Sequence, residues 1–153
     1  MKRVPDTART GFTLVELVLI VVVLAILASI AIPRMGWGTI GKVEVESTAR
    51  QFSGYLRLAR SLAITHASSN SEGYRVVLSR RQPYTYSLIN NDTSEVVKGP
   101  IELPEGVSRS GNRTYRFTPL GNLSGSRELS VQFSKDGDTA TVTVTPVGRI
   151  TVQ

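Results

Sequence analysis

Residues 11–34 of the chain read GFTLVELVLIVVVLAILASIAIPR. Between Leu17 and Ile32 this stretch contains no charged residue, and Ser29 carries its only hydroxyl group. A helix of about 20 residues, rising ~1.5 Å per residue, is long enough to span a bilayer core of ~30 Å. Residues 12 to 32 supply 21 positions. The stretch therefore predicts a transmembrane helix, with Glu16 near one end.

The segment before the apolar stretch is short, polar and basic. It contains Lys2, Arg3 and Arg9 and a single acid, Asp6. Basic residues beside a membrane helix stay on the cytoplasmic side, so the N-terminus is predicted to be cytoplasmic and the rest of the chain to be translocated. Removing this leader would lower the net charge of +6 by two, to +4. The remaining chain would be mildly basic.

Glu16 is the most informative residue of the apolar stretch. A carboxylate inside a membrane costs roughly 2.5–3.5 kcal/mol, so Glu16 is expected to have a cationic partner or to lie near the membrane interface. Cleavage after Gly11 would create an α-amine on Phe12, one helical turn before Glu16. That amine is a suitable partner, either within the chain or from a neighbouring copy.

The string GFTLVE resembles the type III signal of type IV prepilins and type II secretion pseudopilins. The resemblance implies that a prepilin peptidase, a membrane aspartyl enzyme, cuts between Gly11 and Phe12 and methylates the new amine. It also implies that Glu16 helps the subunit to enter a growing filament. Pro33 and Arg34 lie where such proteins interrupt the helix and leave the membrane.

Three other interpretations of the N-terminal stretch stay open. An ordinary signal-anchor helix explains the apolarity and the flanking charge, but it does not explain Glu16 beside the GF pair. A conventional secretory signal would be cleaved at a small-x-small site, which Ser29, Ile30 and Ala31 provide. Glu16 would have no role in assembly if it only extends its carboxylate to water at the interface.

Residues 34–72 are predicted to be a linker followed by an amphipathic helix. Glycines weaken helical continuity between Arg34 and Gly41, where a bend or an extended segment is expected. Beyond this point apolar residues recur at alternating steps of four and three, which is the spacing of one helix face. This stripe is expected to pack on the protein's own sheet. It consists of Val45, Ala49, Phe52, Leu56, Ala59 and Ala63.

Residues 73–153 alternate between apolar and polar positions in short runs separated by turn residues, which is typical of antiparallel strands. A KDGD turn at residues 135–138 joins two of them as a hairpin. The runs cover residues 74–79, 84–89, 94–103, 114–118, 128–134, 139–145 and 149–153. The predicted fold class is therefore α+β.

Four further strings are similar to landmarks of the GspH/FimT class of minor pilin-like proteins. They are ARSLAI at 59–64, LPEGV at 103–107, FTPLGNLSG at 117–125 and VTPVGRITV at 144–152. The resemblance implies a long N-terminal helix, transmembrane and then amphipathic, packed on an antiparallel β-sheet domain. It divides the chain into a cleaved leader (1–11), a transmembrane or filament-core helix (12–33), a linker and amphipathic helix (34–72) and a periplasmic β domain (73–153).

The sequence offers little for catalysis. His66 is the only histidine, cysteine is absent, and no hydrolase or phosphate-binding motif is present. Asp136 and Asp138 flank a glycine, but Ca²⁺ requires six to eight oxygen ligands, so these residues are expected to form a plain hairpin turn. We expect no enzymatic activity, no cofactor and no metal.

The resemblance implies a minor pseudopilin of the type II secretion pseudopilus, anchored in the bacterial inner membrane before assembly. The implied partners are the prepilin peptidase and other major and minor pseudopilins or pilins. The alternative is a FimT-like minor pilin that supports pilus assembly or takes up DNA. That class carries a GRxR motif, whereas this chain has GRIT at 148–151. Candidate phosphate contacts for nucleic acid are Arg149 of this string together with Arg109, Arg113, Arg116 and Arg127.

Overall fold

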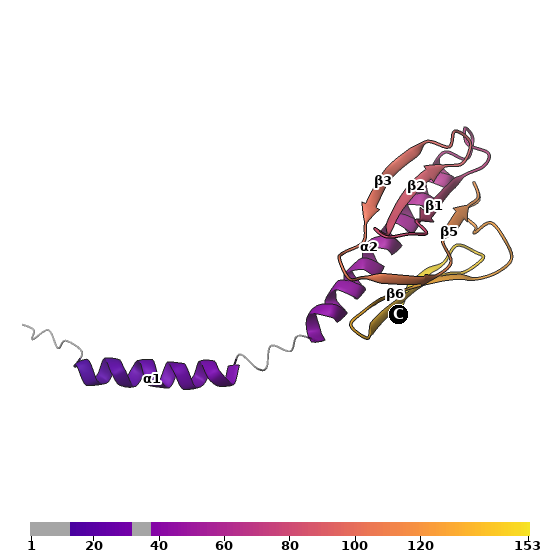
Figure 1. Cartoon of the computed structure of the whole chain (residues 1–153). Helices are drawn as coiled ribbons and strands as arrows, with labels where there is room; N and C mark the ends of the chain where they lie inside the picture. Colours follow the sequence, from indigo (N-terminus) through magenta and orange to yellow (C-terminus); the bar gives the residue numbers. More distant parts are fainter. Residues whose placement is uncertain (1–12, 32–37) are drawn as a thin grey trace, which may run out of the picture. The chain divides into compact units, whose positions relative to one another are not determined.

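A computed structural model describes residues 13–31 and 38–153 of the chain (Figure 1). The chain contains two compact units, of which the second is Gly38–Gln153. Helix α1, Leu14–Ala31, belongs to the first unit, and its side chains from Leu14 to Ser29 are all exposed. Among the helices that these residues form, none is both long enough and apolar enough to cross a membrane.

The second unit consists of one helix and eight strands. Helix α2 is Gly38–Thr65. The strands are β1 (Tyr74–Leu78), β2 (Thr85–Asn90), β3 (Val96–Glu102), β4 (Ser108–Gly111), β5 (Thr114–Phe117), β6 (Leu129–Lys135), β7 (Asp138–Val144) and β8 (Ile150–Val152). They form two four-stranded sheets, ordered β3-β2-β1-β5 and β4-β6-β7-β8, in which all neighbours are antiparallel.

Helix α2 packs against strands of both sheets, and Figure 1 shows it running alongside them. All six residues of the predicted apolar stripe are buried, so the prediction that this face packs on the protein's own sheets is confirmed. Phe52 lies at the centre of the core. Its ring meets those of Tyr86 from β2, Tyr115 from β5 and Phe133 from β6 edge-on, with centroids 5.4 to 5.7 Å apart. One helical side chain therefore joins both sheets.

The start of α2 differs from the sequence prediction. An interruption was expected up to Gly41, whereas α2 already begins at Gly38. Gly41 is buried against the β6–β7 turn, where an added Cβ would lie 3.4 Å from Asp138 Oδ2 and 3.5 Å from the Lys135 carbonyl oxygen. The glycine lets the helix approach this turn closely, and the packing outweighs its poor helix propensity of about 1 kcal/mol.

Tyr86 carries a buried hydroxyl group that has no hydrogen-bond partner. A buried, unsatisfied polar group costs about 1–3 kcal/mol. Tyr86→Phe is therefore expected to raise the free energy of unfolding of the Gly38–Gln153 fragment by about 1 kcal/mol at neutral pH. Urea unfolding followed by circular dichroism measures this change. Tyr115→Phe is the matched control, because the Tyr115 hydroxyl donates to the Asn112 carbonyl oxygen at 3.4 Å.

The same substitution has a predicted pH dependence. Burial, followed by the neighbouring Tyr55, raises the pKa of Tyr86 from 10.0 to about 12. A group whose pKa is raised in the folded state contributes stability below its unfolded pKa and loses it as pH rises through the folded value. Stability should thus fall between pH 10 and 12, and Tyr86→Phe should reduce this fall. An unchanged alkaline profile together with unchanged neutral stability would contradict both expectations.

Candidate functional site

Glu16 lies in the first turn of α1, close to the N-terminal cap. The Glu16 backbone N–H donates to the Thr13 side-chain Oγ1 at 3.3 Å and to the Thr13 carbonyl oxygen at 3.1 Å. Thr13 and Glu16 thus have the spacing of a capping box, and the positive end of the helix dipole favours a carboxylate here. The role of Thr13 was not predicted, although the T-x-x-E pattern before an apolar run indicates such a helix start.

The other processing residues cannot be placed beside Glu16. Gly11, Phe12 and Pro33 lie outside the residues that the structure describes. The cleavage position, the pairing of the new amine with Glu16 and the helix break at Pro33 therefore stay predictions. The described part of this segment is helix α1, whose exposed surface from Leu17 to Leu27 is apolar on every side. Such a helix requires an apolar environment or partner helices.

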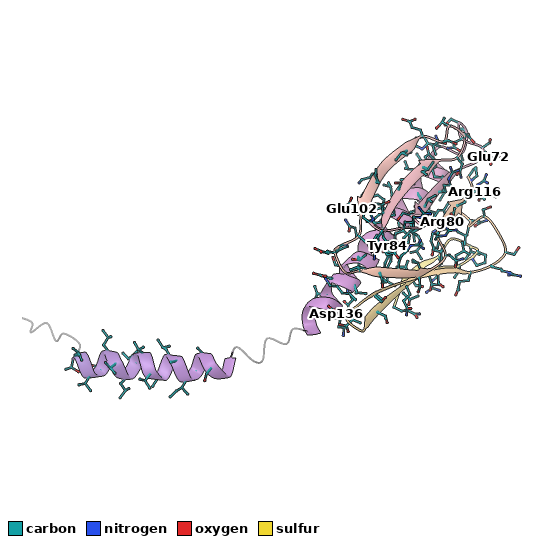
Figure 2. All side chains as sticks on the ribbon, viewed as in Figure 1. Glu72, Arg80, Tyr84, Glu102, Arg116 and Asp136 are labelled. Atoms are coloured by element: carbon teal, nitrogen blue, oxygen red, sulfur yellow. The ribbon has the colours of Figure 1, made fainter. Side chains whose placement is uncertain are left out.

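The five candidate DNA-binding arginines are not equivalent. Arg116 forms an ion pair with the carboxylate of Glu72, and its Nε also donates to the Glu72 carbonyl oxygen at 3.3 Å. Figure 2 shows Arg116 and Glu72 at the same end of the domain. Arg113 is only partly exposed, whereas Arg127 and Arg149 are exposed in loops. The structure therefore leaves Arg127 and Arg149 as the better-exposed pair.

The fifth candidate, Arg109, makes contacts within the domain that the sequence did not predict. Its guanidinium donates to the Ser79 carbonyl oxygen and lies 5.5 Å from the centre of the Tyr84 ring. Burial, followed by repulsion from Arg113, lowers the pKa of Arg109. Because Ser79 follows β1 and Arg109 belongs to β4, this side chain connects the two sheets. It is better suited to stabilising the fold than to binding phosphate.

A cleft of 460 Å³ opens between the start of β2 and the loop that follows β3. It is lined by Tyr84, Leu103 and Pro104, together with the carboxylate residues Glu102 and Glu105. Tyr84 and Glu102 are labelled in Figure 2. His66 is not among the lining residues. Within residues 13–31 and 38–153, no three His, Cys, Asp or Glu side chains are grouped closely enough to hold a metal ion.

Three of the landmark strings meet at the C-terminal end of α2. Arg60, from ARSLAI, donates its Nε to the carbonyl oxygen of Gly121, from FTPLGNLSG, at 2.9 Å. Gly148, from VTPVGRITV, faces the same carbonyl, since an added Cβ would lie 2.2 Å from it and 2.9 Å from Arg60 Nε. The partner of the Arg60 guanidinium is thus a backbone carbonyl oxygen.

Comparison with known proteins gives the fold. No protein-family model matches the chain, and no curated protein matches it. Two solved structures resemble it, and both are crystal forms of the type IV minor pilin FimU of Pseudomonas aeruginosa, at 15% identity. The similarity to the first structure covers 72% of this chain and 88% of the FimU chain, with a TM-score of 0.56. The similarity to the second structure covers 70% of this chain and 90% of the FimU chain, with a TM-score of 0.53. The chain has a pilin-like fold.

Proposed function

We propose that this chain is a non-catalytic subunit of a pilus-type filament, held in the bacterial inner membrane by the apolar segment 12–33 before it is assembled. The observation that carries the proposal is the combination of two features in one chain. A pilin-like domain is joined to a helix that is apolar on every side, with a lone carboxylate, Glu16, in its first turn. Neither feature alone would suggest assembly.

In this proposal the prepilin peptidase removes residues 1–11 and methylates the amine of Phe12. The C-terminal domain lies in the periplasm and the original N-terminus in the cytoplasm. Helix α1 then leaves the lipid for the filament core, where contact with other helices replaces contact with lipid. The carboxylate of Glu16 pairs with the N-terminal amine of a neighbouring subunit, a charge-assisted contact that is strong where water is excluded.

Two machines can recruit such a subunit. The GspH/FimT landmarks favour a minor pseudopilin of type II secretion, which supports export of proteins across the outer membrane. The similarity of the fold to that of the type IV minor pilin FimU favours a minor subunit of a type IV pilus. Both readings use the same anchoring and assembly steps, so they differ in the neighbouring subunits and in the process that fails when the chain is lost.

DNA binding is a second candidate function. The observation in its favour is the exposure of Arg127 and Arg149, two guanidinium groups in loops of the pilin-like domain. Such side chains contact phosphates without reading sequence. The pairing of Arg116 with Glu72 lowers the number of free cations, and Thr151 stands where the GRxR motif has its second arginine. The filament role is therefore proposed first.

The test is a strain that lacks the gene, complemented with wild type, Glu16→Ala or Glu16→Gln. Loss of a charge-assisted contact of about 1.5–3 kcal/mol should lower filament-dependent activity by about 10–100-fold. Glu16→Gln is the matched variant, because it keeps the size of the side chain and removes the charge. We expect both variants to fail, with normal amounts of protein in the membrane.

Three activities are scored in each strain, namely release of exported enzymes to the medium, twitching motility and DNA uptake. Retention of enzymes in the periplasm supports the secretion pseudopilus. Normal secretion with lost twitching supports a type IV pilus, and a selective loss of transformation supports DNA uptake. Full activity of the Glu16→Ala strain in all three assays would contradict the proposed assembly role.

A further inference from the structure

The domain contains two copies of the same turn. Residues 118–122 read TPLGN and residues 145–149 read TPVGR. In each copy the glycine N–H donates to the threonine carbonyl oxygen, at 2.8 Å for Gly121 and 2.9 Å for Gly148. The threonine N–H in turn donates to the carbonyl oxygen of the fifth residue, at 2.9 and 3.0 Å. Both glycines have positive φ, 77° and 78°. We call these two segments the twin turns.

The twin turns lie side by side although one follows β5 and the other follows β7. The Gly121 carbonyl faces Gly148, and Gly121 itself lies against Ile64 in the last turn of α2, where an added Cβ would lie 2.7 Å from Ile64 Cδ1. The hydrogen bond from Arg60 holds the same carbonyl. The two tips are thus fixed relative to one another and to the C-terminal end of α2.

The tips of the twin turns are apolar and exposed. Leu120 is 82% exposed, Val147 is 67% exposed, and the neighbouring Ile64 is 49% exposed. Turn tips usually carry polar or small residues, and exposed apolar side chains gathered on a rigid base indicate a contact surface. Arg149 lies two residues after Val147 and is exposed, so the surface is both apolar and positively charged.

The opposite end of α2 carries the complementary features. Asp136 lies in the β6–β7 turn and Asp138 is the first residue of β7, and both lie against Gly41 near the beginning of α2. Lys135 forms an ion pair with Glu44, donates to the Glu105 carbonyl oxygen at 2.8 Å, and has its pKa raised chiefly by the hydrogen bond to Glu44.

The charges at this end add up to a negative surface. The cations at this end are two, Lys135 and the exposed Lys42. The acids are four, Glu44, Glu105, Asp136 and Asp138. Val43, in the second turn of α2, is 61% exposed and supplies an apolar contact. Asp136 therefore marks an acidic end, and Figure 2 shows it at the end of the domain where α2 begins, away from Arg116 and Glu72.

We propose that the twin turns of one copy of this chain bind the acidic end of a second copy, so that the domains stack head to tail. Arg149 meets the carboxylates of Asp136 and Asp138, and Leu120 and Val147 cover Val43. The two surfaces lie at opposite ends of a helix of 28 residues, which is about 42 Å long. A contact between two different surfaces does not close on itself and therefore extends into a filament.

The small area of the twin turns limits how tightly they can bind a second copy. Three exposed side chains cover far less than the ~800 Å² per partner of a standard stable interface. The twin turns alone should therefore not hold two free domains together. The twin turns bind the acidic end only when pairing of the α1 helices already holds two copies close together. That pairing raises the effective concentration of one surface near the other. In this respect the inference rests on the proposed function.

The test uses thiol cross-linking of full-length chains in cells, which is clean because the chain contains no cysteine. One copy carries Asn122→Cys beside the twin turns, and the other carries Lys42→Cys beside Val43. Both positions are exposed. A bismaleimide should give a mixed dimer at least about tenfold more abundant than the dimers from two Asn122→Cys copies or from two Lys42→Cys copies.

Charge reversal tests the contact itself. Arg149→Glu in the Asn122→Cys copy should lower the yield of mixed dimer about fivefold, as expected for loss of an interfacial charge pair. Combining Asp136→Arg with Asp138→Arg in the other copy should restore it. Arg80→Glu is the matched control, because Arg80 is exposed but lies in the loop after β1. The yield should stay unchanged.

Three results would overturn the inference: equal yields of mixed and same-position dimers, no effect of Arg149→Glu, or cross-linking of Asn122→Cys to another protein alone. Failure of the proposed function is read separately, from the activity of the Glu16→Ala strain. If Glu16→Ala abolishes activity and no mixed dimer forms, the filament role stands and head-to-tail stacking of this chain is wrong.

Discussion

Replacing Phe52 by alanine is expected to lower the free energy of unfolding of the Gly38–Gln153 fragment by about 3–5 kcal/mol. Phe52 is fully buried and meets three aromatic rings edge-on, two from the first sheet and one from the second. Truncation would remove its burial and leave a cavity between the sheets and α2. No neighbouring side chain can fill that cavity without leaving its own contacts.

The matched control for this experiment is Leu58→Ala. Leu58 lies on the same helix but is 36% exposed, so its truncation should cost less than about 1 kcal/mol. Urea unfolding followed by circular dichroism measures both variants at equal protein concentration. A loss below about 1.5 kcal/mol for Phe52→Ala would show that α2 does not join the two sheets as described.

Much of this fold follows from periodicity. The six residues of the helical stripe repeat at the spacing of one helix face, and all six are buried. The strands with clear alternation, such as β6 and β7, were predicted close to their observed bounds. Local pattern is sufficient where one face of an element is apolar and the other polar, because burial then selects a single orientation.

The division into two sheets did not follow from the sequence. Strand β4 reads SRSG, which has no apolar alternation, and it pairs with β6 from a distant part of the chain. Its partners are defined by backbone hydrogen bonds and by the connection that Arg109 makes to Ser79, neither of which has a sequence signature. The early start of α2 was missed for a similar reason, since Gly41 is helical because of what it packs against.

The candidate site shows the same limits. The position of Glu16 in the first turn of a helix was predictable from the apolar run and the GF pair, while the function of Gly11, Phe12 and Pro33 stays a prediction. The partner of Arg60 was not predictable, because a backbone carbonyl 61 residues away leaves no charge or pattern in the sequence. The landmark strings indicated a resemblance, and the structure adds that three of them form one cluster.

That cluster leads to the second large expected effect, in Gly148→Ala. With φ at 78°, an alanine at this position costs about 1–2 kcal/mol in backbone strain. Its Cβ would also lie 2.2 Å from the Gly121 carbonyl oxygen, which is backbone and cannot rotate away. Moving that carbonyl would break its hydrogen bond with Arg60, at a further cost of about 1 kcal/mol. We expect a total loss of about 2–3 kcal/mol in the free energy of unfolding.

Gly137→Ala separates the two causes. Gly137 has a comparable φ of 91°, but an added Cβ would meet no atom within 4 Å, so this variant should show backbone strain alone. Arg60→Ala removes the same hydrogen bond by removing its donor. The loss of unfolding free energy in the double variant Gly148→Ala and Arg60→Ala should therefore be smaller than the sum of the two single losses. Equal stability of the Gly148→Ala and Gly137→Ala fragments in urea would contradict the close approach of the twin turns. In that case Leu120 and Val147 would not be held on a common rigid base, and the proposed stacking surface would lose its structural support.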